Sequence, residues 1–442
     1  MNRMTLPRAI VALATGLCLI AGTPALAKKA KRHHHHRHAH HGLSFGNAKV
    51  QALNYNTLQG WNKDDLVAAF QAYLKSCDAI KHASKAARKA RPVFGGLYNA
   101  CMHALSAGAL DRQEARKFFE ANFKPIRVTV NQTIGPYSGT GGFYTGYWEL
   151  QVKGSRKKTD EFTVPLYRTP KSRRLRHLDR STIAAGALKG KGLAICWIKD
   201  PIDAFFAEIQ GSIRVKLDTG ELLRLNFDSA NGKHYTPVGR ILIDRGIYTA
   251  QEMSMAKIRE YMTEHPKEGR ALRLMNHSFV FFKETPLKPN EEPVGAEGVP
   301  LTPGRSLAVD YKRHVYGTPI WIDAKFPLKS TAPDDRFQHL MFAQDTGGAI
   351  RGVARADIYF GHGERIGLVA GRIKQFGKFV MLVPKDLSVR TTGPNVIPLP
   401  PPRPKAIAMR EAMAKGKDAG LAVTGTLSAS SAVNVPLPRP RP

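Results

Sequence analysis

Three aspartates in the last third of the chain have the type and spacing that suit acid–base chemistry. Asp345 and Asp357 lie twelve positions apart in the glycine-rich run 345–361, DTGGAIRGVARADIYFG, and Asp310 lies upstream in RSLAVDY. Apolar residues precede Asp345 and follow Asp357. A carboxyl group among apolar neighbours has its pKa raised towards neutrality, which suits a proton donor. We interpret the three acids as one candidate site, and for each of them structural hydrogen bonding is the alternative role.

The elements that must position these acids are predicted from the hydrophobic period. Between residues 62 and 122 the period is helical, with caps at Asp65 and at Asp111, whose partner Glu114 completes a capping box. From about Lys124 the period is two, in short runs bounded by glycine, proline and polar turns, apart from one helix that starts at Thr249 or Ser254 and ends at Pro266. The predicted strands are RVTVNQT, FYTGYWELQV, DEFTVPLYRTP, SIRVKL, LLRLNF, HSFVFFK, RSLAVDY, TPIWIDA, HLMFAQD, ADIYF and KFVMLVP. This pattern predicts a mainly β protein with a helical N-terminal layer and two β-barrel-like domains.

Both ends of the chain differ in composition from its middle. Residues 1–27 have the basic start, apolar run and Ala25-Leu26-Ala27 site of a cleavable signal peptide, so we expect export. Cys18 is a candidate for lipidation, but a lipoprotein signal has a small residue at the position of Leu17. Cleavage after Ala27 is therefore the favoured interpretation. Residues 28–45 form a basic, histidine-rich segment that is either a solvated linker or a metal-capturing tract. Residues 387–442 form a proline-rich basic tail without the apolar content to fold.

Export also decides how the cysteines and the charge are interpreted. Cys77 and Cys101 flank a predicted helical hairpin and are candidates for a disulfide, while Cys196 is expected to be a buried apolar residue. No Cys/His spacing typical of a metal site occurs, so neither metal nor cofactor is predicted. With 67 Lys+Arg against 35 Asp+Glu, the net charge of +32 favours anionic partners. For an exported protein these are the cell wall or anionic envelope polymers rather than nucleic acid.

Six ordered blocks give the chain a family resemblance. They are GFYTGYWE (142–149), QGSIRVKLDTG (210–220), NGKHYTPVGRILIDRG (231–246), HSFVFF (277–282), PLTPGRSLAVD (300–310) and the run 345–361. Over about residues 130–384 this series resembles the membrane-bound lytic murein transglycosylase A (MltA) family, including its C-terminal three-aspartate (3D) module. Many relatives are outer-membrane lipoproteins, and this chain departs from them in lacking a good lipidation signal.

The resemblance implies a double-psi β-barrel with a second, smaller inserted β-domain and a glycan-binding groove between them. It divides the folded part into a catalytic domain of residues 46–145 and 266–386 and an insert of residues 146–265. It also implies a lyase of the lytic exotransglycosylase type, which cleaves the β-1,4 bond between N-acetylmuramic acid and N-acetylglucosamine and leaves a 1,6-anhydro end. The expected protein is a monomer in the periplasm, associated with the cell wall or outer membrane, whose partner is the glycan strand of peptidoglycan.

Individual residues take expected roles from the aligned blocks. Asp357 aligns with the single catalytic acid, which first donates and then accepts a proton. Asp345 and Asp310 support it. Thr145 and Gln210 line the groove, although an ordinary strand threonine and a turn glutamine are equal alternatives. Tyr147 is a candidate for stacking on a sugar, or else a core residue.

Two arginines close to Asp357 would lower its pKa if they pointed at it. We therefore expect Arg351 and Arg355 to face the lactyl carboxylates of the substrate.

Two other functions compete with this interpretation. Asp345-Thr346-Gly347 and Asp218-Thr219-Gly220 both match the tripeptide of aspartic proteases, which need two such acids sharing a proton. A protein of the same fold that binds peptidoglycan with little or no turnover is the non-enzymatic alternative.

Overall fold

The computed structural model describes residues 45, 48–84, 92–286 and 291–387. The predicted signal peptide, nearly all of the histidine-rich segment and the predicted tail beyond residue 387 lie outside the described residues. Within the described ranges no helix is long and apolar enough to cross a membrane. Nor do three or more His, Cys, Asp or Glu side chains gather there in a way that would hold a metal ion.

Helices form the N-terminal region, as the sequence predicts. They are a 3-10 turn (Tyr55–Thr57), α1 (Leu66–Ile80), α3 (Pro92–Ala107) and α4 (Arg112–Asn122). The Asp65 side chain accepts the first-turn N–H of Ala68 (3.0 Å), and Asp111 and Glu114 form the predicted capping box at the start of α4. These caps satisfy backbone N–H groups that a helix start leaves without partners.

The three helices pack on the sheet through one apolar cluster. A disulfide joins Cys77 in α1 to Cys101 in α3. The buried faces of the helices share this cluster with Trp321, Phe342 and Leu382, which come from three strands of the sheet. Cys196, the other cysteine among the described residues, is a buried free thiol.

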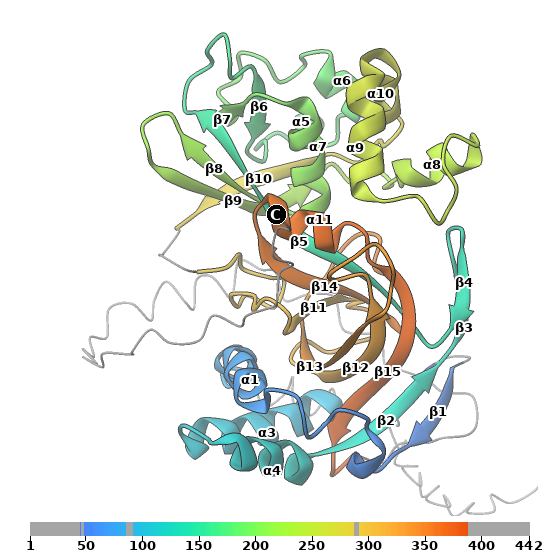
Figure 1. Ribbon diagram of the computed structural model, residues 1–442. Coiled ribbons are helices and arrows are strands. Elements are labelled where there is room, and N and C mark those ends of the chain that lie inside the picture. The colour runs from blue at the N-terminus through green and yellow to red at the C-terminus, as the bar shows by residue number, and fades with distance from the viewer. Residues whose placement is uncertain (1–44, 46–47, 85–91, 287–290, 388–442) are drawn as a thin grey trace, which may run out of the picture. The chain divides into compact units, whose positions relative to one another are not determined.

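Strands make up most of the remaining chain, so the fold is mainly β with a helical N-terminal region (Figure 1). The strands are β1 (Lys49–Ala52), β2 (Phe123–Thr129), β3 (Asn131–Ile134), β4 (Tyr137–Thr140), β5 (Gly142–Ser155), β6 (Val164–Tyr167), β7 (Ala194–Ile198), β8 (Ser212–Leu217), β9 (Leu222–Ala230), β10 (Val280–Thr285), β11 (Ser306–Val309), β12 (Pro319–Phe326), β13 (Asp335–Asp345), β14 (Arg355–His362) and β15 (Lys374–Pro384). All of them except the β3–β4 hairpin belong to one thirteen-stranded sheet.

Six of these strands pair in a closed circuit. Going round it, β15 pairs with β12, β12 with β13, β13 with β11, β11 with β14, β14 with β5, and β5 again with β15. The β11–β13 and β14–β5 pairings are parallel and the other four are antiparallel. Figure 1 shows β11, β12, β13, β14 and β15 curling around one another beside β5. The circuit brings the strands that carry Asp345 and Asp357 within one strand of each other.

The long strand β5 connects the circuit to the rest of the sheet. Its first part pairs with β14 and β15, and its second part pairs with β8 and β7. The predicted boundary between residues 145 and 146 falls inside this strand. Beyond β5, strand β10 pairs with β9, so residues 280–285 lie in the sheet that β8 and β9 form. The division into domains stays a prediction.

The chain from the second part of β5 to β10, here called the second region, contains short helices. These helices carry weaker sequence signals than the strands of the same region. They are α5 (Arg173–Arg176), α6 (Arg180–Ala184), α7 (Pro201–Gln210), α8 (Val238–Asp244), α9 (Met255–Glu264) and α10 (Pro266–Leu274), and α11 (Glu364–Ala370) follows β14. The sequence identifies α9, which Ser254 caps and which ends before Pro266. Pro266 opens α10, because proline is compatible with the first turn of a helix. The pattern missed α5, α6, α8 and α11, because helices of one or two turns are too short to show a period. It also missed the longer helices α7 and α10.

Candidate active site

Two of the three predicted acids, Asp345 and Asp357, lie on one row that crosses four neighbouring strands. Asp357 of β14 is the register partner of Thr145 on β5 and of Ala308 on β11. Ala308 is in turn the register partner of Asp345 at the end of β13. Register partners on adjacent strands project from the same face of a sheet. The row Asp345–Ala308–Asp357–Thr145 therefore places two carboxyl groups on one face, about 10 Å apart at Cα, with only a methyl side chain between them.

Asp357 is half-buried and has one oxygen left for a ligand. Its Oδ1 accepts a hydrogen bond from Thr145 Oγ1 at 2.5 Å. Its Oδ2 accepts none from the described residues. Desolvation raises the pKa of Asp357 above its ordinary value, although the charge of Arg355 and the Thr145 hydrogen bond oppose the rise. The group thus combines a raised pKa with an open oxygen, as a proton donor requires.

Arg355 lies beside Asp357 instead of facing outward. Its guanidinium is buried, donates from Nη2 to Thr145 Oγ1 at 2.7 Å and from Nη1 to Ala356 O, and lies over the Phe143 ring at 5.3 Å. In this structure the guanidinium contacts Thr145 and Ala356, and the expectation that Arg355 faces the lactyl carboxylate of a substrate stays a prediction. Because side chains two apart on a strand share a face, Arg355 and Asp357 both project towards Thr145.

Asp345 is held by donors on both of its oxygens. Tyr147 donates its hydroxyl to Oδ2 at 2.9 Å, and the backbone N–H of Ala296 donates to Oδ1 at 2.9 Å. Desolvation raises the pKa of Asp345 to about 6, and the nearby Asp357 charge adds to the rise, while the hydrogen bonds oppose it. The two acids are therefore electrostatically coupled, so protonation of one favours ionisation of the other.

Asp310 supports the loop between β13 and β14 and does not reach the row. It is buried, and it accepts from the backbone N–H of Lys312 (3.1 Å) and of Gly352 (2.9 Å). Arg351, in the same loop, is exposed and donates to the carbonyl oxygens of Gly347 (3.0 Å) and Ile350 (2.8 Å). Both residues therefore shape the loop that connects Asp345 to β14.

Tyr147 and Gln210 both interact with the middle of β5, Tyr147 as one of its residues and Gln210 from the end of α7. The Tyr147 ring is buried, packs against Tyr359 with 5.2 Å between ring centroids, and reaches Asp345 through its hydroxyl. Gln210, at the last turn of α7, accepts the backbone N–H of Trp148 at 3.0 Å. In this arrangement Tyr147 orients an acid and Gln210 ties α7 to β5.

The sequence reasoning missed Tyr235, a half-buried residue of the second region. Desolvation raises the pKa of Tyr235 to about 12, opposed by Arg180 and aided by the negative charge of Asp357. A charge on Asp357 acts on this phenol because the two groups are close. Tyr235 lies in the third of the six ordered blocks, so the family resemblance could have identified it as a candidate site residue.

The second Asp-Thr-Gly tripeptide does not join the first. Asp218 is exposed in the turn between β8 and β9, and its backbone N–H donates to Gly154 O. The described hydrogen bonds of the Asp345 carboxylate are with Tyr147 and Ala296. The pair of contacting carboxyls that an aspartic protease needs is therefore not formed by these two tripeptides.

Comparisons with known proteins agree with the resemblance in the sequence. Residues 143–283 match the family model described as the MltA specific insert domain, and residues 305–383 match the 3D domain. The chain is similar to membrane-bound lytic murein transglycosylase A of Escherichia coli K12, with 32% identity over 328 residues that cover 73% of this chain and 85% of that protein. The protein of the same name from Vibrio cholerae is 33% identical over 240 residues, which are 53% of this chain and 63% of that protein. The chain thus spans less than two thirds of the Vibrio protein.

Solved structures give the same result. The crystal structure of a membrane-bound lytic murein transglycosylase from Agrobacterium tumefaciens matches with a TM-score of 0.66 and 29% identity, over 76% of this chain and 98% of that one. The crystal structure of E. coli MltA with bound chitohexaose matches with a TM-score of 0.55 and 29% identity, over 71% of this chain and 89% of that one.

Proposed function

This chain belongs to the family of membrane-bound lytic murein transglycosylase A, and on that premise we propose that it cleaves peptidoglycan as a lytic transglycosylase with Asp357 as its single catalytic acid. The bond cleaved is the β-1,4 bond between N-acetylmuramic acid and N-acetylglucosamine, and the product carries a 1,6-anhydro-muramic end. The observation that carries the proposal is the state of Asp357: half-buried, raised in pKa, held on one oxygen by Thr145 and open on the other.

The proposed mechanism uses one carboxyl group in two steps. Protonated Asp357 donates its proton from Oδ2 to the bridging oxygen, and the bond from that oxygen to the muramic C1 breaks. The carboxylate then accepts the proton of the muramic C6 hydroxyl as its oxygen bonds to C1. The sugar supplies its own nucleophile, so no second carboxylate is needed to activate water. The Thr145 hydrogen bond fixes the Asp357 carboxyl during both transfers.

Hydrolysis is the second candidate, and the position of Asp345 favours it. The strands that carry the two carboxyl groups are separated by β11, and in an inverting glycosidase the two acids likewise stand apart so that the second can activate a water. Against this, the two oxygens of Asp345 already accept from Tyr147 and Ala296, which leaves it poorly placed as a base. A binding protein without turnover is the remaining alternative.

Mass spectrometry of the products separates these candidates. We expect the full chain incubated with purified sacculi to release muropeptides that end in anhydro-muramic acid and are lighter by one water than hydrolysis products. Products with reducing ends alone would show a hydrolase and overturn the proposal. Absence of any product, with sacculi still bound, would show the binding protein.

The closed circuit of six strands fits the double-psi β-barrel that the family resemblance implies, and we assign it that role. The second part of β5 and strands β6 to β9 fall in the expected insert of residues 146–265, and we assign β10, which lies beyond that bound, to the same inserted β-domain because it pairs with β9. Export, a periplasmic location and contact of the basic tails with anionic wall polymers belong to the same proposal. The same proposal includes cleavage from the ends of glycan strands and a monomeric state of the protein.

The charge of Arg355 predicts how activity depends on pH. Asp357 must be protonated to donate, so the rate falls as the pH rises through its pKa. Arg355 lowers that pKa, and its replacement by methionine removes the charge while filling the same space. We therefore expect Arg355→Met to move the alkaline limb of the kcat profile to higher pH, by on the order of one unit. The measurement is the rate of anhydro-product release between pH 4 and 9.

Arg351→Met is the matched control for this prediction. Its guanidinium binds loop carbonyls, so the alkaline limb should stay where the unmodified protein has it. An alkaline limb that stays fixed in Arg355→Met, or moves to lower pH, would contradict the assignment of that limb to Asp357.

A further inference from the structure

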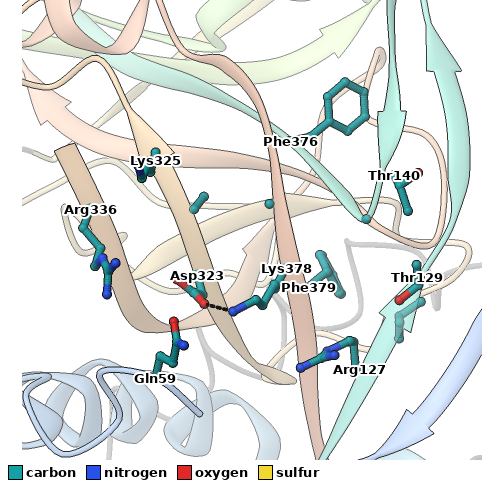
Figure 2. A pocket seen from close by; sticks show the side chains of 14 residues that line it. Gln59, Arg127, Thr129, Thr140, Asp323, Lys325, Arg336, Phe376, Lys378 and Phe379 are labelled. Atoms are coloured by element: carbon teal, nitrogen blue, oxygen red, sulfur yellow. Dashed lines mark hydrogen bonds and ion pairs between the residues drawn. The ribbon is translucent and has the colours of Figure 1, made fainter. Parts of the chain in front are cut away.

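A hollow in the described surface is lined by residues that do not belong to the row of acids. It has a volume of about 570 Å³ and is bounded by strands β2, β4, β12, β13 and β15 (Figure 2). Four of its charged side chains are cationic, namely Arg127, Lys325, Arg336 and Lys378, and one is anionic, Asp323. None of these residues contacts Asp357, Asp345 or Thr145 among the described interactions. We call this hollow the basic pocket.

The single acid of the basic pocket is already neutralised. Lys378 Nζ lies 2.6 Å from Asp323 Oδ2, the bond drawn in Figure 2, and Gln338 donates to Asp323 Oδ1 at 2.9 Å. This leaves the charges of Arg127, Lys325 and Arg336 without an acidic partner among the described residues. Three uncompensated cations around one concave surface attract an anion.

Two features of these cations are unfavourable. Lys325 and Arg336 are exposed register partners on β12 and β13, and like charges directly opposite each other destabilise a sheet. Arg127 has a buried Nε without a hydrogen-bond partner in the described structure. A buried donor without a partner is destabilising. A bound anion would relieve both.

From this geometry we propose that the basic pocket binds the carboxylates of peptidoglycan peptide stems. The inference rests on the proposed action on peptidoglycan, and it gives the enzyme a second contact that distinguishes peptide-bearing strands from bare glycan. Arg336 and Arg127 present planar forks that match a carboxylate. The half-buried Phe376 offers an apolar surface to the aliphatic parts of a peptide.

The test reverses the charges of the register partners Lys325 and Arg336 and leaves the row of acids unchanged. The probe is the mixture of peptides released from sacculi by an amidase, and its binding is measured by calorimetry in the Asp357→Asn background, where no turnover disturbs the signal. We expect the double variant Lys325→Glu/Arg336→Glu to bind these peptides about tenfold more weakly or worse. In the otherwise unmodified chain, the same pair should lower turnover of intact sacculi severalfold and leave turnover of amidase-stripped glycan strands unchanged.

Lys153 and Lys216 provide the matched control. They are also exposed register partners of like charge, on β5 and β8, and they lie outside the basic pocket. Lys153→Glu/Lys216→Glu therefore makes the same change in net charge, and it should leave peptide binding and both turnover rates unchanged. If both double variants weaken binding equally, overall charge is responsible and the pocket is not the site.

The remaining outcomes are also decisive. Unchanged peptide binding in Lys325→Glu/Arg336→Glu would overturn the inference, and so would inorganic phosphate displacing the peptides at a lower concentration than acetate does. Failure of the unmodified chain to release anhydro-products from both intact sacculi and stripped glycan strands would instead refute the proposed function, because stripped strands carry no peptide for the pocket to bind.

Discussion

Replacement of Asp357 by asparagine should lower the rate of anhydro-muropeptide release by about a thousandfold, within the range of 10²–10⁴ for a well-placed acid–base group. Asparagine has nearly the same shape and can still accept the Thr145 hydroxyl, but it carries no proton to donate at the open oxygen. Binding of sacculi and the thermal unfolding midpoint should therefore stay close to those of the unmodified chain. The measurement is product release from purified sacculi under saturating conditions.

The other two aspartates are the controls for this experiment. Asp345→Asn removes a charge that is coupled to Asp357 and should reduce the rate by a smaller factor, with an altered pH profile. Asp310→Asn disturbs the acceptor for Gly352 N–H, so its effect should appear mainly in stability. If Asp345→Asn abolished turnover while Asp357→Asn retained it, the roles of the two acids would have to be exchanged.

Local features of the fold were predictable because the residues that cause them are neighbours in sequence. The capping box needs only Asp111 and Glu114, three positions apart, and the sequence predicted it correctly. The period of two likewise predicted most of the strands around the site, and the mainly β fold with a helical N-terminal region is confirmed. These are properties of a few consecutive side chains, which is why a single sequence reveals them.

The row of acids needed information that no local pattern contains. Thr145 and Asp357 are 212 residues apart, and their hydrogen bond depends on the register between β5 and β14. A shift of that register by one residue would turn the side chains of one strand to the opposite face. Without the family resemblance, the sequence suggests three acids in one region and gives no reason to pair any of them with Thr145.

The strand period is enough to place Arg355 on the face of Asp357. The expectation that Arg355 faces a carboxylate of the substrate stays a prediction. Because side chains two apart on a strand share a face, Arg355 was bound to lie on the face of Asp357. The structure accommodates it by desolvating both groups, and the net effect still raises the pKa of Asp357.

Asp64 provides the strongest prediction for stability, because it joins the helical region to the strand circuit. Its fully buried carboxylate accepts from Arg305 Nη1 (2.7 Å) and Nη2 (2.8 Å), from the backbone N–H of Leu340 (2.8 Å), and contacts His339 Nδ1 (2.7 Å). Asp64→Ala would leave the buried Arg305 guanidinium without its counter-charge. The free energy of unfolding should therefore fall by about 3–5 kcal/mol, measured by denaturant titration at pH 7.

A surface pair is the matched control for Asp64→Ala. Asp78 and Lys81 form an exposed ion pair in the α1 region, so Asp78→Ala should change the free energy of unfolding by less than about 1 kcal/mol. A loss as small as this in Asp64→Ala would mean that the buried pair contributes little to holding the two regions together.

The sign of the pH dependence provides an independent check on Asp64. Desolvation alone would raise the pKa of Asp64, but the hydrogen bonds and charges of His339 and Arg305 outweigh it and hold the pKa well below the usual range. An acid whose pKa is lower in the folded than in the unfolded state stabilises the fold above its unfolded pKa of about 3.9. That contribution is lost as the pH falls below this value. The difference in the free energy of unfolding between Asp64→Ala and the unmodified chain should therefore become much smaller in acid. If that difference stayed constant from pH 7 to pH 2, the loss of stability would come from packing and not from charge.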